Sequence, residues 1–213
     1  ESHKAEVILF GETYDECFEK ALEISKKENL TFIHPFDDPE VIAGQGTIGL
    51  EILRQSHTPP DAIYIAVGGG GLIAGTSISI LESFPNCNIF AAEPKGFDDM
   101  KRSLAANKIL SNKPGNHSIC DAIITPSPGK VPFEIVKKYV KGGYVVTDQE
   151  VCNAMRIAFR YFKLVTEPGG AVALASVFKP NFKPLGQDII VILSGGNVDE
   201  TLFSSVLSQK LEI

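Results

Sequence analysis

The chain has 213 residues, of which 44% are hydrophobic and 22% are charged, so it can bury a core and fits one large or two small domains. Its formal net charge is −6 with acidic and basic residues interspersed, which argues against a nucleic-acid partner. The apolar runs are shorter than a membrane span and no signal peptide opens the chain, so we expect no membrane association. The cysteines lack a metal-type C-x-x-C pair, which favours buried, reduced thiols in a cytoplasmic protein; they are Cys17, Cys87, Cys120 and Cys152.

The N-terminal segment has the pattern of a β-α-β unit with little of a sheet around it. Ala5–Phe10 and Leu30–Ile33 show the apolar pattern of buried strands. Thr13 and Glu16 form a capping box that opens the intervening helix. A two-stranded parallel sheet is not independently stable, so we expect its neighbours to be missing. We therefore predict that residues 1–45 are the remnant of a smaller domain.

The stretch from Asp61 to Gly75 predicts an anion site. Its apolar start is typical of a strand buried in a parallel sheet, and residues 72–83 have the pattern of a helix. Between them stand four glycines, Gly68, Gly69, Gly70 and Gly71. Such a loop can close on a phosphate, whose charge the N–H groups and dipole of the helix start favour. The spacing does not fit a dinucleotide fingerprint and suits a compact monophosphate; the alternative is a tight turn that only packs strand against helix.

Strands and helices keep alternating along the rest of the chain. Further buried strands are predicted at 88–92, 144–146 and 188–193, with helices ending near 55 and at 98–107, 133–140, 147–163 and 171–178. This alternation predicts an α/β fold with a parallel sheet flanked by helices, in a larger domain that spans residues 46–213. Such sheets bind ligands at the carboxyl ends of their strands. The glycine loop, Glu93, Thr147-Asp148 and Ser194-Gly195-Gly196 all follow predicted strands, and their convergence supports a ligand site.

Five segments together resemble the serine/threonine dehydratase and serine racemase family. They read HPFDDPEVIAGQGTIGLEIL (34–53), VGGGGLIAG (67–75), AAEPKGFDD (91–99), EPGGAVALA (167–175) and LSGGNVD (193–199). The segments occur in the family's order and cover nearly the whole chain. The resemblance implies the tryptophan synthase β-like fold of pyridoxal-phosphate enzymes (PLP fold type II), with an incomplete smaller domain and a larger domain.

The resemblance also implies roles in binding pyridoxal 5′-phosphate. Gly68, Gly69, Gly70 and Gly71, with the amide of Leu72, are similar to the family's cradle for the cofactor phosphate. Ser194 resembles the hydroxyl that faces the pyridine nitrogen, although a strand-end turn residue is the alternative. A hydroxyl there does not force a pyridinium, which suits β-elimination. Glu167 resembles a family residue that lies near the cofactor ring. Its alternative role is to place a negative charge at the start of the following helix, where the helix dipole favours it.

A divalent-cation site is implied in the same way. Glu93, Asp99 and the backbone carbonyl of Phe97 resemble the metal ligands found in part of the family. Two carboxylates and a carbonyl are hard oxygen ligands, which suit Mg²⁺ or Ca²⁺ completed by water. An ordinary acidic loop is the alternative.

The sequence departs from the family pattern in two places. Residues 118–123 contain Cys-Asp-Ala where many relatives carry Ala-Asp-Gly, and this form favours the dehydratases. The family's Schiff-base lysine lies in an S-F-K-x-R-G segment, and no lysine of this chain has that context. Residues 113–117 imitate the family's substrate-carboxylate loop, but they follow the glycine loop instead of preceding it. We therefore expect the C-terminal part of the enzyme, without the N-terminal portion, and assign no catalytic residue.

We therefore hypothesise that the chain is part of a pyridoxal-phosphate-dependent L-serine/L-threonine dehydratase (ammonia-lyase). The complete enzyme would convert a small amino acid into a 2-oxo acid and ammonia, whereas this chain alone would be inactive. Its expected partners are the substrate, the missing N-terminal segment and further copies in a homo-oligomer. Two alternatives stay open: a serine racemase of the same fold, and a non-catalytic phosphate-ligand-binding subunit.

Overall fold

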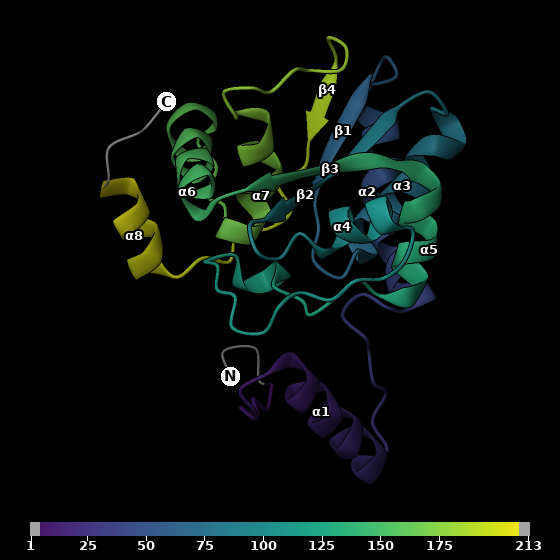
Figure 1. Ribbon diagram of the computed structural model, residues 1–213, viewed down its shortest axis with the longest axis vertical. Helices are drawn as coiled ribbons and strands as arrows, with labels where there is room; N and C mark the ends of the chain where they lie inside the picture. The colour runs from purple at the N-terminus through teal and green to yellow at the C-terminus, as the bar shows by residue number, and fades with distance from the viewer. Residues whose placement is uncertain (1–4, 209–213) are drawn as a thin grey trace. The chain divides into compact units, whose positions relative to one another are not determined.

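The computed structural model describes residues 5–208 and divides into two compact units, residues 1–34 and 35–213 (Figure 1). The first unit contains helix α1 (Tyr14–Glu28). Its predicted capping box is confirmed: the Glu16 amide donates to Thr13 Oγ1 at 3.3 Å, and the Thr13 amide donates to Glu16 Oε2 at 3.1 Å. These two bonds satisfy amides that the first helical turn cannot pair internally.

The strands predicted at Ala5–Phe10 and Leu30–Ile33 are wrong. Neither segment is in a strand, and Leu9 and Ile33 are 91% and 73% exposed. The apolar pattern is local, whereas a strand needs a hydrogen-bonded neighbour. Within the described part of this unit, no segment supplies that neighbour.

The second unit is built on the predicted parallel sheet, which confirms the α/β fold class. The sheet has the order β3-β2-β1-β4, and each of its neighbouring pairs is parallel. Its strands are β1 (Ala62–Ala66), β2 (Asn88–Pro94), β3 (Val140–Val146) and β4 (Ile189–Val191). The third strand begins earlier than the sequence predicted, because Val140 already pairs with Ile89 before a register shift.

The predicted helices alternate with these strands, and one further helix, α8, follows the last strand. They are α2 (Pro39–Gln55), α3 (Gly71–Ser83), α4 (Asp99–Ala106), α5 (Lys130–Tyr139), α6 (Asp148–Ile157), α7 (Pro168–Val177) and α8 (Glu200–Ser208). Two shorter elements are the 3-10 helix η1 (Asp121–Ile123) and the π-helix η2 (Ala158–Phe162). The domain boundary expected between residues 45 and 46 lies inside α2, whereas the chain divides into its two units after His34.

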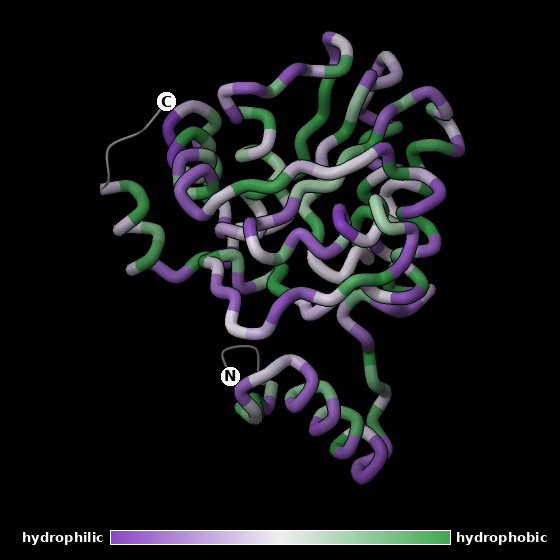
Figure 2. The backbone as a smooth tube through the Cα atoms, viewed as in Figure 1, coloured by the Kyte–Doolittle hydropathy of each residue, from purple (hydrophilic) through white to green (hydrophobic). Residues whose placement is uncertain are grey.

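The helices cover both faces of the sheet (Figure 1). Each face of the sheet packs against its own hydrophobic core. Alternate residues of β1 belong to the two cores, because successive side chains of a strand point to opposite faces. Ala62, Tyr64 and Ala66 pack with α6 and α7, whereas Ile63 and Ile65 pack with α3 and α5. Figure 2 shows hydrophobic runs along the central strands and alternating polar and apolar residues along the outer helices.

Close packing between α2 and α3 determines where the glycine loop lies. A Cβ at Gly75 of α3 would lie 2.1 Å from the carbonyl oxygen of Ile42 in α2. A Cβ at Gly49 would lie 2.6 Å from Ser79 Cβ. A side chain would fit at neither glycine. The two helix backbones can therefore approach closely, and this contact packs the N-terminal half of α3 against α2.

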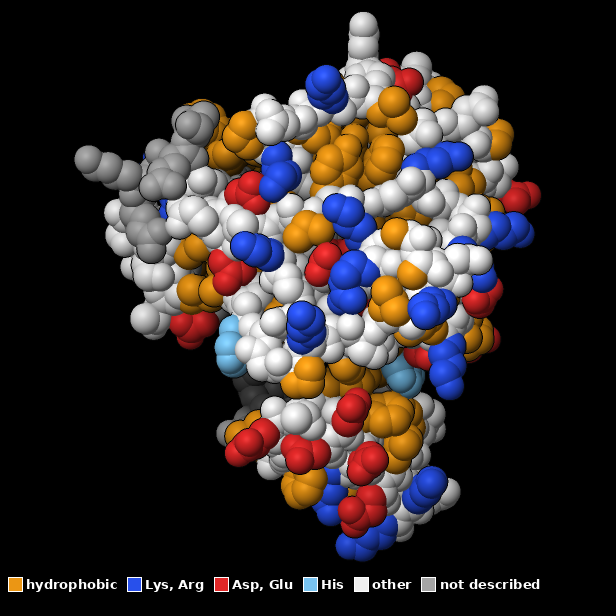
Figure 3. All heavy atoms as spheres, viewed as in Figure 1, with side chains coloured by type: hydrophobic (Ala, Val, Ile, Leu, Met, Phe, Trp, Pro, Cys, Tyr) orange, Lys and Arg blue, Asp and Glu red, His pale blue; other side chains and the backbone are white. Residues whose placement is uncertain are grey.

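The distribution of charge, the lengths of the helices and the burial of the cysteines can be compared with the sequence predictions. On the face shown in Figure 3, basic side chains are spread over the second unit and do not form one patch. No helix in residues 5–208 combines the length and apolar character needed to cross a membrane. The four cysteines are free, but the expectation of burial is wrong for Cys17, which is exposed.

The first unit should open more easily than the sheet. Val7–Phe10 lie outside any strand and are at least half exposed, whereas Ile63–Ala66 are buried and paired with β2, and Ile63 and Tyr64 also pair with β4. Hydrogen exchange monitored by mass spectrometry should find Val7–Phe10 exchanging more than about a hundredfold faster than Ile63–Ala66. Equal protection would mean that another segment or chain covers these residues.

Candidate functional site

The parallel sheet places the predicted site sequences along one edge. All neighbouring strand pairs are parallel, so their carboxyl ends point the same way. The glycine loop follows β1, Glu93 lies near the end of β2, Thr147 follows β3, and Ser194 lies just beyond β4. The order of the strands makes the glycine loop a neighbour of Ser194 on one side and of Glu93 on the other.

The glycine loop presents hydrogen-bond donors without protein acceptors. Gly70 is the N-cap residue of α3 with φ +97°, and the first turn of this helix has no acidic residue. No hydrogen bond within residues 5–208 uses the amide N–H groups of Gly69, Gly70, Gly71 or Leu72. Free N–H groups and the positive end of the dipole make a helix start an anion site.

Neighbouring atoms explain why this loop is glycine. A Cβ at Gly70 would lie 2.7 Å from Met100 Cε, and one at Gly68 would lie 3.0 Å from Ile123 Cα. The positive φ of Gly70 adds a conformational cost for any L side chain. The loop therefore keeps its backbone groups uncovered by side chains of its own.

A second corner brings Glu167 and the Ser194 loop together. The Glu167 amide donates to the carbonyl oxygen of Gly195 at 3.1 Å, and the Asn197 amide donates to Glu167 Oε2 at 3.0 Å. Although Glu167 is the N-cap residue of α7, its carboxylate makes no capping bond to that helix. Its side chain instead holds the loop that carries Ser194, which is exposed.

Two residues that the sequence reasoning missed connect these corners. The buried Thr166 donates its hydroxyl to Gly195 O at 2.9 Å. Ile123 lies beside Gly68, and it also lies 3.6 Å from the Cβ position of Gly169 at the start of α7. The glycine loop and α7 therefore share Ile123 as a neighbour.

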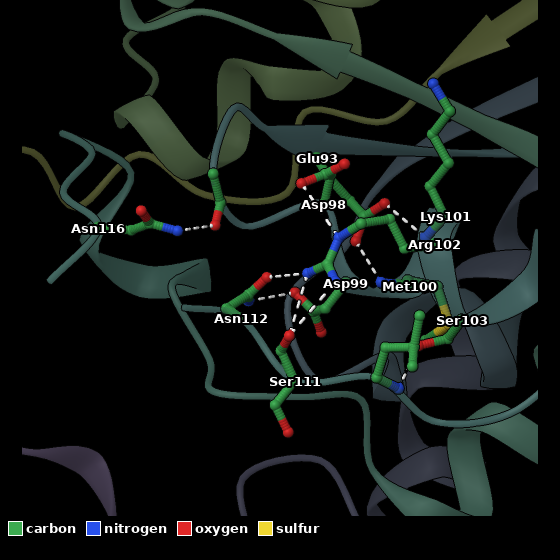
Figure 4. Close-up of polar contacts among 12 residues, drawn as sticks. Glu93, Asp98, Asp99, Met100, Lys101, Arg102, Ser103, Ser111, Asn112 and Asn116 are labelled. Carbon is green, nitrogen blue, oxygen red and sulfur yellow. Dashed lines mark hydrogen bonds and ion pairs between the residues drawn. The ribbon is translucent and has the colours of Figure 1, made fainter. Parts of the chain in front are cut away.

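The acidic corner follows β2, the strand next to β1 on the side away from β4, and Figure 4 shows its polar contacts. Glu93 is fully buried and accepts hydrogen bonds from the amides of Met100 at 2.7 Å and Lys101 at 2.9 Å. These amides belong to the first turn of α4, so Glu93 caps that helix. Asp99 Oδ1 accepts from Asn112 Nδ2 at 2.5 Å, and Asn112 Oδ1 accepts from Arg102 at 2.6 Å.

Burial changes the acidity of both carboxyl groups. It raises the pKa of Glu93 to about 8, with a further increase from the charge of Asp99. Burial raises the pKa of Asp99 to about 6. Asp99 Oδ2 is buried without a hydrogen-bond partner in the described structure. Two neighbouring buried carboxyl groups can both ionise when a cation lies between them.

The predicted metal ligands are close in sequence but few. The Phe97 residue is buried, and its amide donates to the carbonyl oxygen of Pro94 at 3.0 Å. Among residues 5–208, no three His, Cys, Asp or Glu side chains gather in a metal-binding group. A cation at Glu93, Asp99 and the Phe97 carbonyl would therefore complete its coordination with water.

Comparison with known proteins identifies close relatives. Residues 1–195 match the model of a family described as pyridoxal-phosphate dependent enzyme. The chain is 36% identical over 207 residues to an L-threonine ammonia-lyase of Thermotoga maritima, covering 97% of this chain and 51% of the relative. It is 39% identical over 189 residues to a serine racemase of Dictyostelium discoideum, covering 87% of this chain and 58% of the relative.

Solved structures agree with the sequence relatives. The processed form of threonine deaminase isoform 2 from Solanum lycopersicum superposes with a TM-score of 0.85 at 35% identity, covering 94% of this chain and 55% of that one. The serine racemase structure of Dictyostelium discoideum gives a TM-score of 0.82 at 36% identity, covering 93% of this chain and 63% of that one. The chain thus spans about half the length of the curated relatives it matches.

The raised pKa values of Glu93 and Asp99 predict a pH-dependent stability. An acid with a raised pKa in the folded state holds its proton more tightly there, so the stability it contributes is complete below the unfolded pKa and lost as pH rises. The window runs from 4.5 to about 8 for Glu93 and from 3.8 to about 6 for Asp99.

Urea unfolding in the presence of a chelator measures this effect. The free energy of unfolding should fall as pH rises from about 5 to about 8. The fall should be smaller in Asp99→Asn, which retains an acceptor for Asn112 and removes one buried charge. Parallel curves for the two proteins would show that folding does not raise the pKa of Asp99.

Proposed function

Because the chain belongs to the pyridoxal-phosphate-dependent enzyme family of serine/threonine dehydratases and serine racemases, we propose that it is the cofactor-cradling part of an L-serine/L-threonine dehydratase. This ammonia-lyase gives a 2-oxo acid and ammonia. The observation that carries the proposal is the set of uncommitted amides at Gly69–Leu72, at the start of a helix without acidic residues in its first turn. A phosphate dianion supplies the acceptors that these donors lack.

The residues present fit the cofactor. The loop of Gly68, Gly69, Gly70 and Gly71, with the Leu72 amide, would hold the phosphate through backbone N–H groups that no protein acceptor in residues 5–208 uses. The cofactor, when bound, supplies an electron sink for the charge that deprotonation leaves on the substrate. What this chain adds is the position of the cofactor and the hydrogen bonds around it.

Ser194 would face the pyridine nitrogen of the cofactor. A neutral hydroxyl can donate to or accept from that nitrogen without forcing it to carry a proton. This moderates the electron sink, which suits elimination because the departing hydroxyl group takes up the negative charge. Glu167 would act as a positioning residue, since its carboxylate accepts from the Asn197 amide and fixes the loop that carries Ser194.

The remaining catalytic groups would come from another segment. The chain contains no S-F-K-x-R-G sequence around a lysine, and it spans 51% and 58% of two curated relatives. We propose that the missing segment supplies the Schiff-base lysine and the substrate-carboxylate loop. The four free cysteines support a reducing, cytoplasmic compartment for the complete enzyme.

A serine racemase is the second candidate. The 39% identity to the Dictyostelium enzyme favours it, whereas Cys120-Asp121-Ala122 favours a dehydratase. The two reactions differ in the fate of the substrate proton, which a racemase returns to the opposite face of Cα. The product therefore distinguishes the candidates directly.

The complete enzyme should release 2-oxobutyrate from L-threonine or pyruvate from L-serine, and the 213-residue chain alone should release neither. Each product is measured by coupled reduction with a dehydrogenase, and D-serine is measured by chiral chromatography. D-serine as the main product would replace the dehydratase with the racemase.

The isolated chain also tests the assignment of the lysine. After incubation with pyridoxal phosphate and borohydride reduction, mass spectrometry should find no single lysine modified stoichiometrically. One fully modified lysine would mean that this chain carries the attachment site itself.

We also propose a Mg²⁺ or Ca²⁺ site at Glu93, Asp99 and the Phe97 carbonyl. Its support is the pair of buried carboxyl groups with raised pKa values and the unpartnered Asp99 Oδ2. Hard oxygen ligands of this kind suit either cation. The proposed role is stabilisation of the loop between β2 and α4.

Added cation should raise the melting temperature. At a concentration near a hundred times Kd, mass action contributes about 2.7 kcal/mol, which corresponds to a rise of roughly 5–10 °C for a chain of this size. Asp99→Asn should remove most of the rise. Asp98→Asn is the matched control, because Asp98 pairs with Arg102 at 3.5 Å and is not a proposed ligand. An equal rise in all three proteins would reveal unspecific ionic stabilisation.

A further inference from the structure

The turn of residues 35–39 lies against the glycine loop. A Cβ at Gly69 would lie 2.2 Å from the ring of Phe36, which means that the ring packs directly on the loop backbone. A Cβ at Gly71 would lie 3.1 Å from the Phe36 backbone. Both glycines thus leave room for one aromatic residue against the loop backbone.

The same ring also covers the start of α5. A Cβ at Gly129 would lie 3.0 Å from Phe36 Cδ2, and the Gly129 amide donates to the carbonyl oxygen of Gly69 at 2.9 Å. The ring therefore covers a hydrogen-bonded pair of glycines from two different loops. This hydrogen bond uses the Gly69 carbonyl and leaves the Gly69 amide uncommitted.

Two carboxylates hold the turn in this place. Asp37 accepts hydrogen bonds from the amides of Lys130 at 3.0 Å and Val131 at 2.9 Å. It caps α5 in place of the N-cap residue Gly129, which has no side chain to accept these bonds. Asp38 caps α2 by accepting from the amides of Glu40 and Val41. The turn is thus joined to two helices that flank α3, with Phe36 directed at the loop.

We propose that Phe36 is a positioning residue of the phosphate cradle: its ring holds the Gly69–Gly71 backbone in the conformation that presents the free amides to a phosphate. The inference rests on the proposed function of the glycine loop. An unsupported glycine loop has many accessible conformations, and binding would have to order it. A rigid ring packed on the loop removes most of that ordering cost before the ligand arrives.

Two ligands without an aldehyde separate this role from general stability. Pyridoxine 5′-phosphate carries the phosphate and pyridoxine lacks it, and neither can react with a lysine. Calorimetric titration of the 213-residue chain should show a strong preference for the phosphorylated ligand. Phe36→Ala should weaken its binding about tenfold, since the loop must then be ordered on binding, and should leave pyridoxine binding unchanged. The affinity of Phe36→Leu for pyridoxine 5′-phosphate should lie between those of the wild-type chain and Phe36→Ala. This variant also provides a second test if Phe36→Ala folds poorly.

Phe84→Leu is the matched control. Phe84 is also half-buried and lies at the opposite end of α3, so its truncation changes the packing of the same helix away from the loop. It should leave the preference for the phosphorylated ligand unchanged. A wild-type chain without that preference would overturn the cradle itself, and the inference with it. A wild-type preference that survives in Phe36→Ala would overturn the role of Phe36 alone.

A double-mutant cycle tests the contact directly. Gly69→Ala should weaken pyridoxine 5′-phosphate binding in the wild-type background, because its Cβ would displace the Phe36 ring. In the Phe36→Ala background the loss of affinity caused by Gly69→Ala should be at least about threefold smaller, since contacting residues are energetically coupled. Equal losses in both backgrounds would show that the ring does not position the loop.

Discussion

Backbone N–H groups at the start of α3 set the main constraint on this structure. A buried helix start has donors that its own carbonyls cannot satisfy, and side chains of Ser, Thr, Asp or Asn usually accept from them. Here the cap is Gly70, and the amides from Gly69 to Leu72 have no acceptor in residues 5–208. The close packing of α2 on α3, the ring of Phe36 and the Gly129 amide all act to hold this uncapped helix start in place.

The glycine loop and the acidic corner at Glu93 and Asp99 favour ligands of opposite charge. The glycine loop is rich in donors and has no acidic residue in its helical turn, whereas the neighbouring loop buries Glu93 and Asp99. An anion suits the first corner and a cation suits the second, because each supplies the charge that burial leaves uncompensated. Two ligands of opposite charge would therefore stabilise adjacent loops of one sheet edge.

Local signals in the sequence predicted most of the fold. Thr13 with Glu16 marks the start of α1, and the apolar runs of β1 and β2 identify the buried strands, because capping and burial depend on neighbours along the chain. The pattern at Ala5–Phe10 misled the prediction, since strand pairing depends on a distant segment. The sequence reasoning also missed α8, whose single fully buried residue gives a weak pattern.

The site was predicted less completely than the fold. Glycines and carboxylates at strand ends stand out in the sequence, and the parallel sheet brings their loops to one edge. Thr166, Ile123 and Asn112 act through partners between 10 and 55 residues away in the chain, so nothing beside them in the sequence marks their role. Asp37 is a similar case, because the helix it caps begins 93 residues later.

The most direct test of the central claim is the position of a bound phosphate. Crystals of the chain soaked with pyridoxine 5′-phosphate should show the phosphate oxygens within hydrogen-bond distance of the amides from Gly69 to Leu72. The pyridine nitrogen should face Ser194. A phosphate bound elsewhere on the chain, with the glycine loop in contact only with protein or water, would contradict the account.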